Sequence, residues 1–374
     1  MIRALGMVLL ILAPLIAPAA ETLAEVLGRV REQYELPGMA AIAFRRHDIL
    51  EQACCGVRCQ GKDQAITQDD QFHLGSLSKS MTASLAALLI AEKRLSWDDS
   101  LEKILGKTIP QMHPRYRAVT LRQLCEHRGG MPGHANDELW KELWKRSSRP
   151  HNTAAVRSWY VGELLSRPPT QEPGTYVYSN SGYMAAGLIL EAVTGETWDV
   201  MMKKRIFEPL GMMQSGFGPA ATVDMPMAQP WPHIDGKPIA PGIRADNPAA
   251  LGPAGTVRAS MGDLARYGQW HMRSGEPKST PPLSGTAFSE LHRSRHFLKG
   301  QGGYALGWNE VPRPWAKGNA LMHTGTNTMN YAVIWLAPYA DLGIAVACNE
   351  GQRNAERALD NVAAWLVKKY AIMR

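Results

Sequence analysis

Residues 331–348 read YAVIWLAPYADLGIAVAC, two apolar runs on either side of the turn-forming residues PYAD. Short apolar runs joined by a Pro-containing turn are typical of a β-hairpin. Two further extended apolar stretches occupy residues 38–46 and 49–57, near the other end of the chain. The sequence therefore predicts one antiparallel sheet to which both ends of the chain contribute strands.

Helical patterns fill the chain between these stretches. Residues 76–94 carry apolar side chains at helical spacing, which predicts a long helix with one buried face. Helix-like pieces separated by Pro and Gly follow as far as about residue 245. Further helices are expected over residues 22–35 and 355–370.

The predicted fold class is α/β (α+β), with the antiparallel sheet flanked by helices and a mainly helical lobe inserted into it. The sheet lobe would comprise about residues 21–75 and 250–374, and the helical lobe about residues 76–249. A Pro-rich stretch, residues 226–253, reads as a long surface loop, and loops of that length tend to border functional sites.

The first twenty residues have the composition of a secretory signal. Arg3 is followed by an apolar run interrupted by Pro14, and small residues precede the polar Glu21. The apolar run is too short for a membrane span. We expect residues 1–20 to be removed on export, leaving a mature domain over residues 21–374 in the periplasm or outside the cell.

The overall composition excludes several classes of protein. With 45% hydrophobic and 20% charged residues, the 374-residue chain is neither disordered nor fibrous. Its 41 basic and 34 acidic residues give a formal charge of +7, but the basic residues occur at most in pairs such as Arg45-Arg46. Because nucleic-acid binding needs clustered positive charge, we expect no nucleic-acid partner. The mild positive balance suits an acidic cell-wall surface.

Residues that commonly bind metals do not form a recognisable site. His292 and His296 are four apart, but Arg293 stands where a zinc protease needs Glu. Three of the five cysteines lie within residues 54–59, in an extended setting that favours at most one local disulfide. The pairing of the cysteines stays open, and neither a metal nor a cofactor is expected.

Ser76 and Lys79 form the first candidate catalytic pair. Residues three apart on a helix share a face, so the Lys79 amine can reach the Ser76 hydroxyl, and Gly75 places that hydroxyl at the predicted helix N-terminus. Partial burial would lower the pKa of Lys79 toward neutrality and let it accept the serine proton. The alternative for this short motif is an ordinary helix start with Ser76 as its cap.

Tyr178, Ser179 and Asn180 form the second group, on a turn that leads into a helix expected over residues 182–194. A phenol held beside Lys79 can act as a base and later as the acid for a leaving group. The Asn180 amide can accept a hydrogen bond from Lys79 and donate one to a substrate carbonyl.

The third group, His323-Thr324-Gly325-Thr326, comes just before the first strand of the predicted hairpin. Gly325 permits close approach of a ligand to a strand edge, and the two threonine hydroxyls can bind a carboxylate. The backbone N–H groups of Ser76 and Thr326 are candidates for an oxyanion hole.

The three groups in this order resemble the penicillin-recognising serine hydrolases of the class C β-lactamase type, which include serine D-Ala-D-Ala carboxypeptidases and related esterases. Other stretches are also similar to that family, and the resemblance extends over nearly the whole mature chain. These stretches are residues 119–132, 206–212, 252–255 with 263–265, and 304–308. The resemblance implies a β-lactamase/transpeptidase-like catalytic domain.

The resemblance also implies roles for the site residues. Ser76 would attack a carbonyl to form an acyl-enzyme, Lys79 and Tyr178 would shuttle the proton, and Asn180 would orient the substrate. Substrate would also contact the strand edge at His323, Thr324, Gly325 and Thr326. Whether Lys79 or Tyr178 is the base for acylation stays open.

His323 departs from the class C pattern, which usually has Lys at this position. Histidine is only fractionally cationic near its unperturbed pKa of about 6.5, so it should hold a substrate carboxylate less firmly than Lys. This disfavours a dedicated β-lactamase, and no residue is marked by the sequence as a base for deacylation.

We expect a penicillin-binding, D-Ala-D-Ala carboxypeptidase-like peptidase or amidase, with a cell-wall peptide, a β-lactam or an ester as its small substrate and the peptidoglycan surface as a further partner. One alternative is a short-acyl carboxylesterase or a weak class C-like β-lactamase, which would use the same residues. Another is a non-catalytic peptidoglycan-binding module, although such a module has no need of the Lys79 and Tyr178 pair.

Overall fold

The computed structural model describes residues 21–133, 137–148, 153–274, 276–277 and 280–372. The predicted signal segment, residues 1–20, lies outside the described residues. In the described part of the chain, none of the helices is long and apolar enough to cross a membrane.

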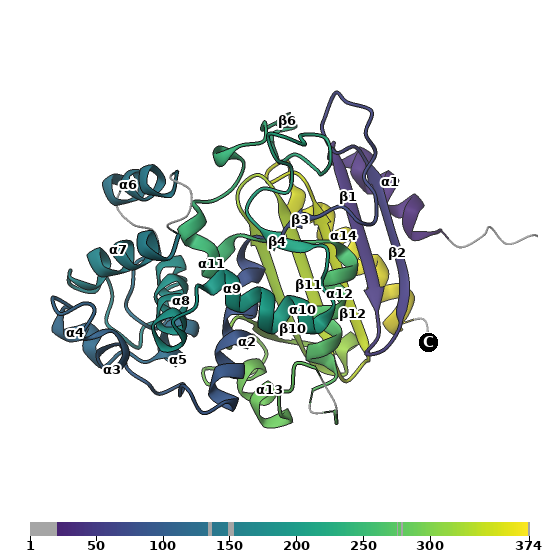
Figure 1. The fold of residues 1–374 in the computed structure, drawn as a ribbon. Coiled ribbons are helices and arrows are strands. Elements are labelled where there is room, and N and C mark those ends of the chain that lie inside the picture. The colour runs from purple at the N-terminus through teal and green to yellow at the C-terminus, as the bar shows by residue number, and fades with distance from the viewer. Residues whose placement is uncertain (1–20, 134–136, 149–152, 275, 278–279, 373–374) are drawn as a thin grey trace, which may run out of the picture.

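An antiparallel sheet of seven strands forms the centre of the molecule, in the order β2-β1-β12-β11-β10-β9-β8. Its N-terminal hairpin pairs with the last strand of the chain, with Met39 opposite Cys348. The prediction that both chain ends build one antiparallel sheet is confirmed (Figure 1). The strands are β1 (Gly38–Phe44), β2 (Ile49–Gly56), β8 (Gly303–Tyr304), β9 (Asn309–Arg313), β10 (Gly318–Thr326), β11 (Tyr331–Ala337) and β12 (Leu342–Cys348).

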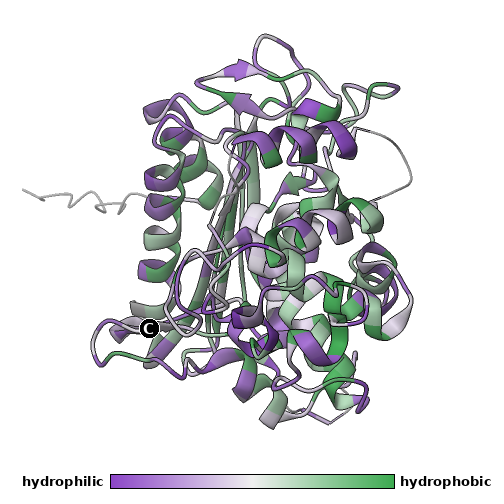
Figure 2. Ribbon diagram, turned by 90° about the vertical axis from the view of Figure 1, so that its left-hand side faces the viewer, coloured by the Kyte–Doolittle hydropathy of each residue, from purple (hydrophilic) through white to green (hydrophobic). Residues whose placement is uncertain are grey.

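Both faces of the sheet are covered, so its central strands are apolar throughout rather than alternating. In β1, Ala40, Ile42 and Phe44 pack into the core on the side of the helical lobe, and the residues between them pack on the opposite side. That opposite side is covered by α1 (Leu23–Gln33) and α14 (Ala355–Val367). Figure 2 shows the sheet nearly edge-on, with α1 and α14 on one side and the helical lobe on the other.

Helix α2 (Ser78–Ala91) lies between the sheet and the rest of the helical lobe. The sequence predicted one buried face, but every residue from Ser78 to Leu89 is buried, because the helix is enclosed on all sides. The other helices of the molecule are α3 (Leu101–Leu105), α4 (Pro114–Arg117), α5 (Leu121–Cys125), α6 (Asp137–Ser147), α7 (Thr153–Leu165), α8 (Asn180–Thr194), α9 (Trp198–Met202), α10 (Glu208–Leu210), α11 (Gly252–Gly255), α12 (Met261–Met272) and α13 (Gly285–His292).

The Pro-rich stretch 226–253 is more than a surface loop. It contains the short hairpin of β5 (His233–Ile234) and β6 (Lys237–Pro238), and it buries His233 and Asp246. It ends in α11, which packs against α2 and α8. A separate small sheet, β3 (Phe72–His73), β7 (Val257–Ala259) and β4 (Ser215–Phe217), joins this region to the start of α2.

None of the five cysteines is paired with another. Cys54 and Cys55 are neighbours on β2 and therefore point to opposite faces of the sheet, where each packs against a different core cluster. This alternation explains why the two cannot form a disulfide with one another.

Candidate active site

Ser76 lies in a 3₁₀ turn, η1 (Gly75–Leu77), that leads directly into α2. One helical turn further on, Lys79 is completely buried, and its Nζ lies 3.0 Å from the Ser76 Oγ. The same Nζ donates hydrogen bonds to the Oδ1 of Asn180 at 2.7 Å and to the backbone carbonyl of Ala254 at 2.8 Å. The structure therefore brings together Ser76, Lys79 and Asn180.

The surroundings of Lys79 favour its neutral form. Burial lowers the pKa of Lys79 well below its ordinary value. A neutral amine has two N–H groups for the two carbonyl acceptors and one lone pair, which can accept the hydroxyl proton of Ser76. Each of its three contacts is then satisfied without a charge.

Tyr178 lies at the mouth of the site, where its ring is 4.8 Å from the Lys79 Nζ. Burial of the phenol raises the pKa of Tyr178 above its ordinary value, although a hydrogen bond with the Ser76 side chain opposes this shift. The phenol therefore keeps its proton at neutral pH. After Tyr178, the Ser179 side chain caps α8, and this cap places Asn180 in the first helical position, facing Lys79.

Histidine 127 is a site residue to which sequence reasoning gave no role. Its ring lies 4.2 Å from that of Tyr178 and 4.5 Å from that of Tyr304, between centroids. Its Nδ1 accepts a hydrogen bond from the backbone N–H of Ser179 at 3.0 Å. Burial lowers the pKa of His127 well below its ordinary value. The only signal in the sequence was its place in the family-like stretch 119–132.

The edge of β10 lies directly against the Ser76 turn because glycine occupies the contact on both sides. A Cβ on Gly325 would lie 1.9 Å from the carbonyl oxygen of Leu74, and one on Gly75 would lie 2.3 Å from the backbone nitrogen of Thr326. Gly75 also has a φ of +51°, which favours glycine. This approach brings the backbone of Ser76 close to that of Thr326, as an oxyanion hole requires.

His323 is almost completely buried on β10, with 3% of its surface exposed. Its Nδ1 lies 2.5 Å from the Thr324 carbonyl and its Nε2 lies 3.1 Å from the Tyr304 hydroxyl. A neutral ring satisfies both contacts, since Nδ1–H donates to the carbonyl and Nε2 accepts from the phenol. Burial lowers the pKa of His323 to about 4, so the ring is uncharged at neutral pH.

These residues surround a cavity of about 280 Å³. Its lining is Ser76, Tyr176, Tyr178, Tyr304, Asn309, His323, Thr324, Gly325 and Thr326. Among these described lining residues there is no Lys or Arg, while Lys79 lies beneath the cavity floor. A larger cavity of about 630 Å³, near Arg46 and His292, contains none of the predicted site residues.

The arrangement can support nucleophilic acyl transfer. It has a hydroxyl next to a neutral amine, a protonated phenol at the mouth, and two backbone N–H groups brought together by close packing. Among the described residues, no group of three or more His, Cys, Asp or Glu side chains could hold a metal ion.

The chain is similar to several known proteins in sequence and in fold. The chain is 26% identical to penicillin-binding protein 4 of Amycolatopsis lactamdurans over 86% of its own length and 83% of that protein. It is 29% identical to the lovastatin esterase of Penicillium rubens, over 44% of each chain. In fold it is similar to D-alanine carboxypeptidase AmpC from Burkholderia cenocepacia, with a TM-score of 0.71, 22% identity, and coverage of 92% of this chain and 97% of the other.

A model of the Beta-lactamase family matches residues 22–369. This match covers almost the entire described chain, including the Ser76 turn, the Tyr178 segment and the β10 edge. The chain therefore belongs to the β-lactamase family of serine hydrolases.

Proposed function

We propose that the protein is a peptidase or amidase of the D-Ala-D-Ala carboxypeptidase-like kind that works through an acyl-enzyme on Ser76. The observation that carries the proposal is the buried Lys79, whose Nζ lies 3.0 Å from the Ser76 Oγ and which also contacts two carbonyl oxygens. A peptidoglycan-binding module without catalysis would gain nothing from a buried amine held against a serine.

In this proposal the neutral Lys79 is the base for acylation. It takes the Ser76 proton as Oγ attacks the substrate carbonyl, and the backbone N–H groups of Ser76 and Thr326 stabilise the oxyanion. Tyr178 then gives its proton to the leaving group and regains one from Lys79. Water hydrolyses the acyl-enzyme and releases the acid, which restores the free serine.

The names of related proteins support an amide or peptide substrate. They include a penicillin-binding protein and a D-alanine carboxypeptidase. We propose that the substrate is a short peptide with a D-amino acid at the cleaved bond, such as a cell-wall stem peptide. The composition of residues 1–20 supports export to the compartment where such peptides occur.

The test is release of D-alanine from a synthetic peptide that ends in D-Ala-D-Ala, with the L-Ala-L-Ala peptide alongside. We expect D-selective release by the wild type and none by Ser76→Ala. Ser80→Ala is the matched control, because Ser80 lies on the same buried helix but donates its hydroxyl to the Leu77 carbonyl. Absence of Ser76-dependent release from any peptide would refute the peptidase.

A second candidate, a short-acyl carboxylesterase, is favoured by the neutral His323. A substrate that ends in a free carboxylate would meet no cation among the described residues that line the cavity. Esters and capped amides avoid the free-energy cost of burying an unpaired carboxylate, since they bring no charge into the pocket. One named relative is itself an esterase.

The two candidates separate on matched substrates. The esterase predicts that a nitrophenyl ester of a short acid is cleaved, while neither the free-carboxylate D-Ala peptide nor its amide-capped form is. We also expect His323→Lys to raise kcat/KM for the carboxylate peptide relative to its capped form near neutral pH. An unchanged ratio would show that His323 does not face the substrate carboxylate.

A further inference from the structure

His73 and Asp246 form a buried pair beside the Ser76 turn. The His73 Nε2 lies 2.5 Å from the Asp246 Oδ1, and the two side chains are 4% and 1% exposed. Neither residue lines the cavity. Asp246 comes from the Pro-rich stretch 226–253, far along the chain from the turn.

The hydrogen bonding of His73 fixes its tautomer. Its Nδ1 accepts a hydrogen bond from the backbone N–H of Gly75 at 3.0 Å. A nitrogen that accepts cannot carry a proton, so the ring proton is on Nε2, the nitrogen that lies 2.5 Å from the Asp246 Oδ1. The Asp246 carboxylate thus selects the tautomer that can hold Gly75 in its left-handed conformation, and the Gly75 peptide in turn orients the N–H of Ser76.

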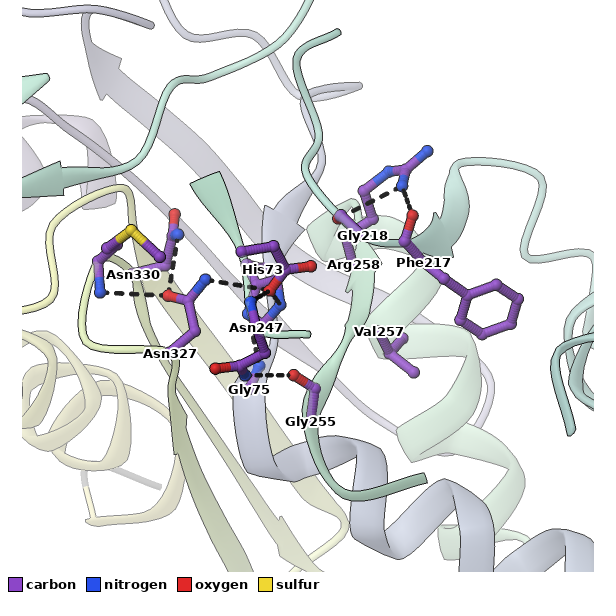
Figure 3. A network of polar contacts seen from close by, with 12 residues as sticks. His73, Gly75, Phe217, Gly218, Asn247, Gly255, Val257, Arg258, Asn327 and Asn330 are labelled. Atoms are coloured by element: carbon purple, nitrogen blue, oxygen red, sulfur yellow. Dashed lines mark hydrogen bonds and ion pairs between the residues drawn. The ribbon is translucent and has the colours of Figure 1, made fainter. Parts of the chain in front are cut away.

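Asp246 also contacts the segment that carries Thr326, the second N–H donor of the candidate oxyanion hole. Its Oδ1 accepts a hydrogen bond at 3.3 Å from the side-chain amide of Asn327, the residue that follows Thr326. One carboxylate oxygen therefore joins β3, which precedes the Ser76 turn, to the residue that follows β10. Figure 3 shows His73 and Asn327 approaching the same point from these two segments, beside Gly75.

The next residue extends the connection to the Lys79 acceptor. The Asn247 side chain donates to the backbone carbonyl of Gly255 at 2.8 Å, and Gly255 follows Ala254, whose carbonyl accepts from Lys79. The Asn247 N–H also donates to the Asp246 Oδ1 at 2.6 Å. Asp246 and Asn247 thus contact residues of three segments near Ser76, namely His73, Asn327 and Gly255. Figure 3 shows the contact between Asn247 and Gly255.

Stability alone does not account for this carboxylate. Asp246 is buried, and its Oδ2 has no hydrogen-bond partner among the described residues. Burial of a charge that is only partly compensated is costly, and apolar replacements of buried ion pairs are often neutral or stabilising. A buried group with such a cost is expected where it supports a functional site.

We propose that Asp246, acting through His73 and Asn327, is a positioning residue that sets the two N–H donors of the oxyanion hole. This inference rests on the proposed acyl-enzyme function of Ser76. It predicts that Asp246 affects the transition state, in which the oxyanion exists, far more than the bound substrate.

The test is Asp246→Ala. This change removes the one oxygen that faces the His73 Nε2 and accepts from the Asn327 amide, so neither the His73 tautomer nor the Asn327 segment is held. We expect kcat to fall about 10- to 100-fold with KM changed less than about twofold, as for other residues that orient catalytic groups. The affinity of a boronic acid that mimics the tetrahedral intermediate should fall by a similar factor.

Asp263→Ala is the matched control. Asp263 is equally buried and accepts from the Gln214 N–H and the Ser215 hydroxyl, but it contacts none of the three segments around Ser76. We expect a change in melting temperature without the fall in kcat. If Asp246→Ala keeps its kcat, or if both variants lose kcat in proportion to their stability, the positioning role is overturned.

A second measurement needs neither variant nor activity. Histidine nitrogen NMR of the wild type should show His73 with its proton on Nε2 and a bare Nδ1; a protonated Nδ1 would overturn the inference. Failure of the acyl-enzyme itself is distinguishable, because it would appear as wild-type turnover that Ser76→Ala does not abolish.

Discussion

Lys79 acts as a base in this account because burial, rather than a neighbouring cation, removes its charge. The amine lies in a fully buried position with two carbonyl acceptors and one hydroxyl. The same burial keeps the proton on Tyr178, which is an acid and not a phenolate at neutral pH. Two groups with pKa values displaced in opposite directions can therefore divide the roles of base and acid.

The pH dependence of kcat/KM tests this division. Catalysis needs neutral Lys79, so activity is present above the depressed pKa of Lys79 and is lost as the pH falls through it. Because the pKa of Tyr178 is raised above its ordinary value, no loss should follow on the alkaline side up to about pH 10. Lys79→Arg, which stays cationic, should reduce kcat at least about 100-fold at every pH. A descending limb between pH 7 and 9 would show that the protonated amine is required.

At the scale of elements, the site depends on the contact between η1 and β10. Gly75 and Gly325 face one another across it, and each lies where a Cβ would overlap backbone atoms of the other element. In the proposed mechanism, the helix start supplies the nucleophile and one N–H donor, and the strand supplies the other. The separation of these elements therefore sets the geometry of the oxyanion hole.

Gly325→Ala should separate the two elements. Its Cβ would lie 1.9 Å from the Leu74 carbonyl, so the strand must shift, and loss of one oxyanion donor costs about 100- to 1,000-fold in kcat. Gly28→Ala is the control, because no atom lies within 4 Å of the added methyl group in the middle of α1. We expect that control to keep full activity and to gain up to about 1 kcal/mol of stability. An active Gly325→Ala would contradict the role given to this contact.

The sequence predicted the elements and motifs that are defined by local patterns. The runs 331–337 and 342–348 coincide with β11 and β12, and the pair Ser76 and Lys79 is in contact through simple helical spacing. What it could not predict depends on tertiary contacts. Asp246 lies in a segment whose composition reads as a surface loop, and only the folded chain brings it to His73.

At the scale of the whole molecule, four histidines have pKa values that burial lowers, which favours their neutral form: His127, His271, His292 and His323. His271 and His292 contact each other through ring nitrogens at 2.8 Å, away from the candidate active site. His323 lines the cavity of that site, and His127 packs beside it. Burial lowers the pKa of all four, to about 3 for His292 and about 4 for His323. These rings are uncharged in the folded protein well below the pH at which they ionise in the unfolded chain.

Folding stability should therefore fall in mild acid. Below about pH 6.5 the unfolded chain binds protons that the folded protein excludes, so the free energy of unfolding decreases as the pH falls toward the folded pKa values. Each such histidine contributes up to about 1.4 kcal/mol per pH unit. Urea unfolding at pH 7.5, 6.5 and 5.5 measures how the free energy of unfolding changes with pH. His292→Gln should reduce this slope by the amount that corresponds to about one bound proton. A free energy of unfolding that does not change between pH 6.5 and 5.5 would be inconsistent with buried neutral histidines.

Every step proposed for this site passes through an acyl-enzyme on Ser76. Intact mass spectrometry after brief incubation with benzylpenicillin and an acid quench can detect this species on the wild type, Ser76→Ala and Ser80→Ala. We expect an added mass of one penicillin on the wild type and on Ser80→Ala, located by peptide mapping at Ser76, and none on Ser76→Ala. An adduct that persists in Ser76→Ala, or that maps to another residue, would rule out Ser76 as the nucleophile.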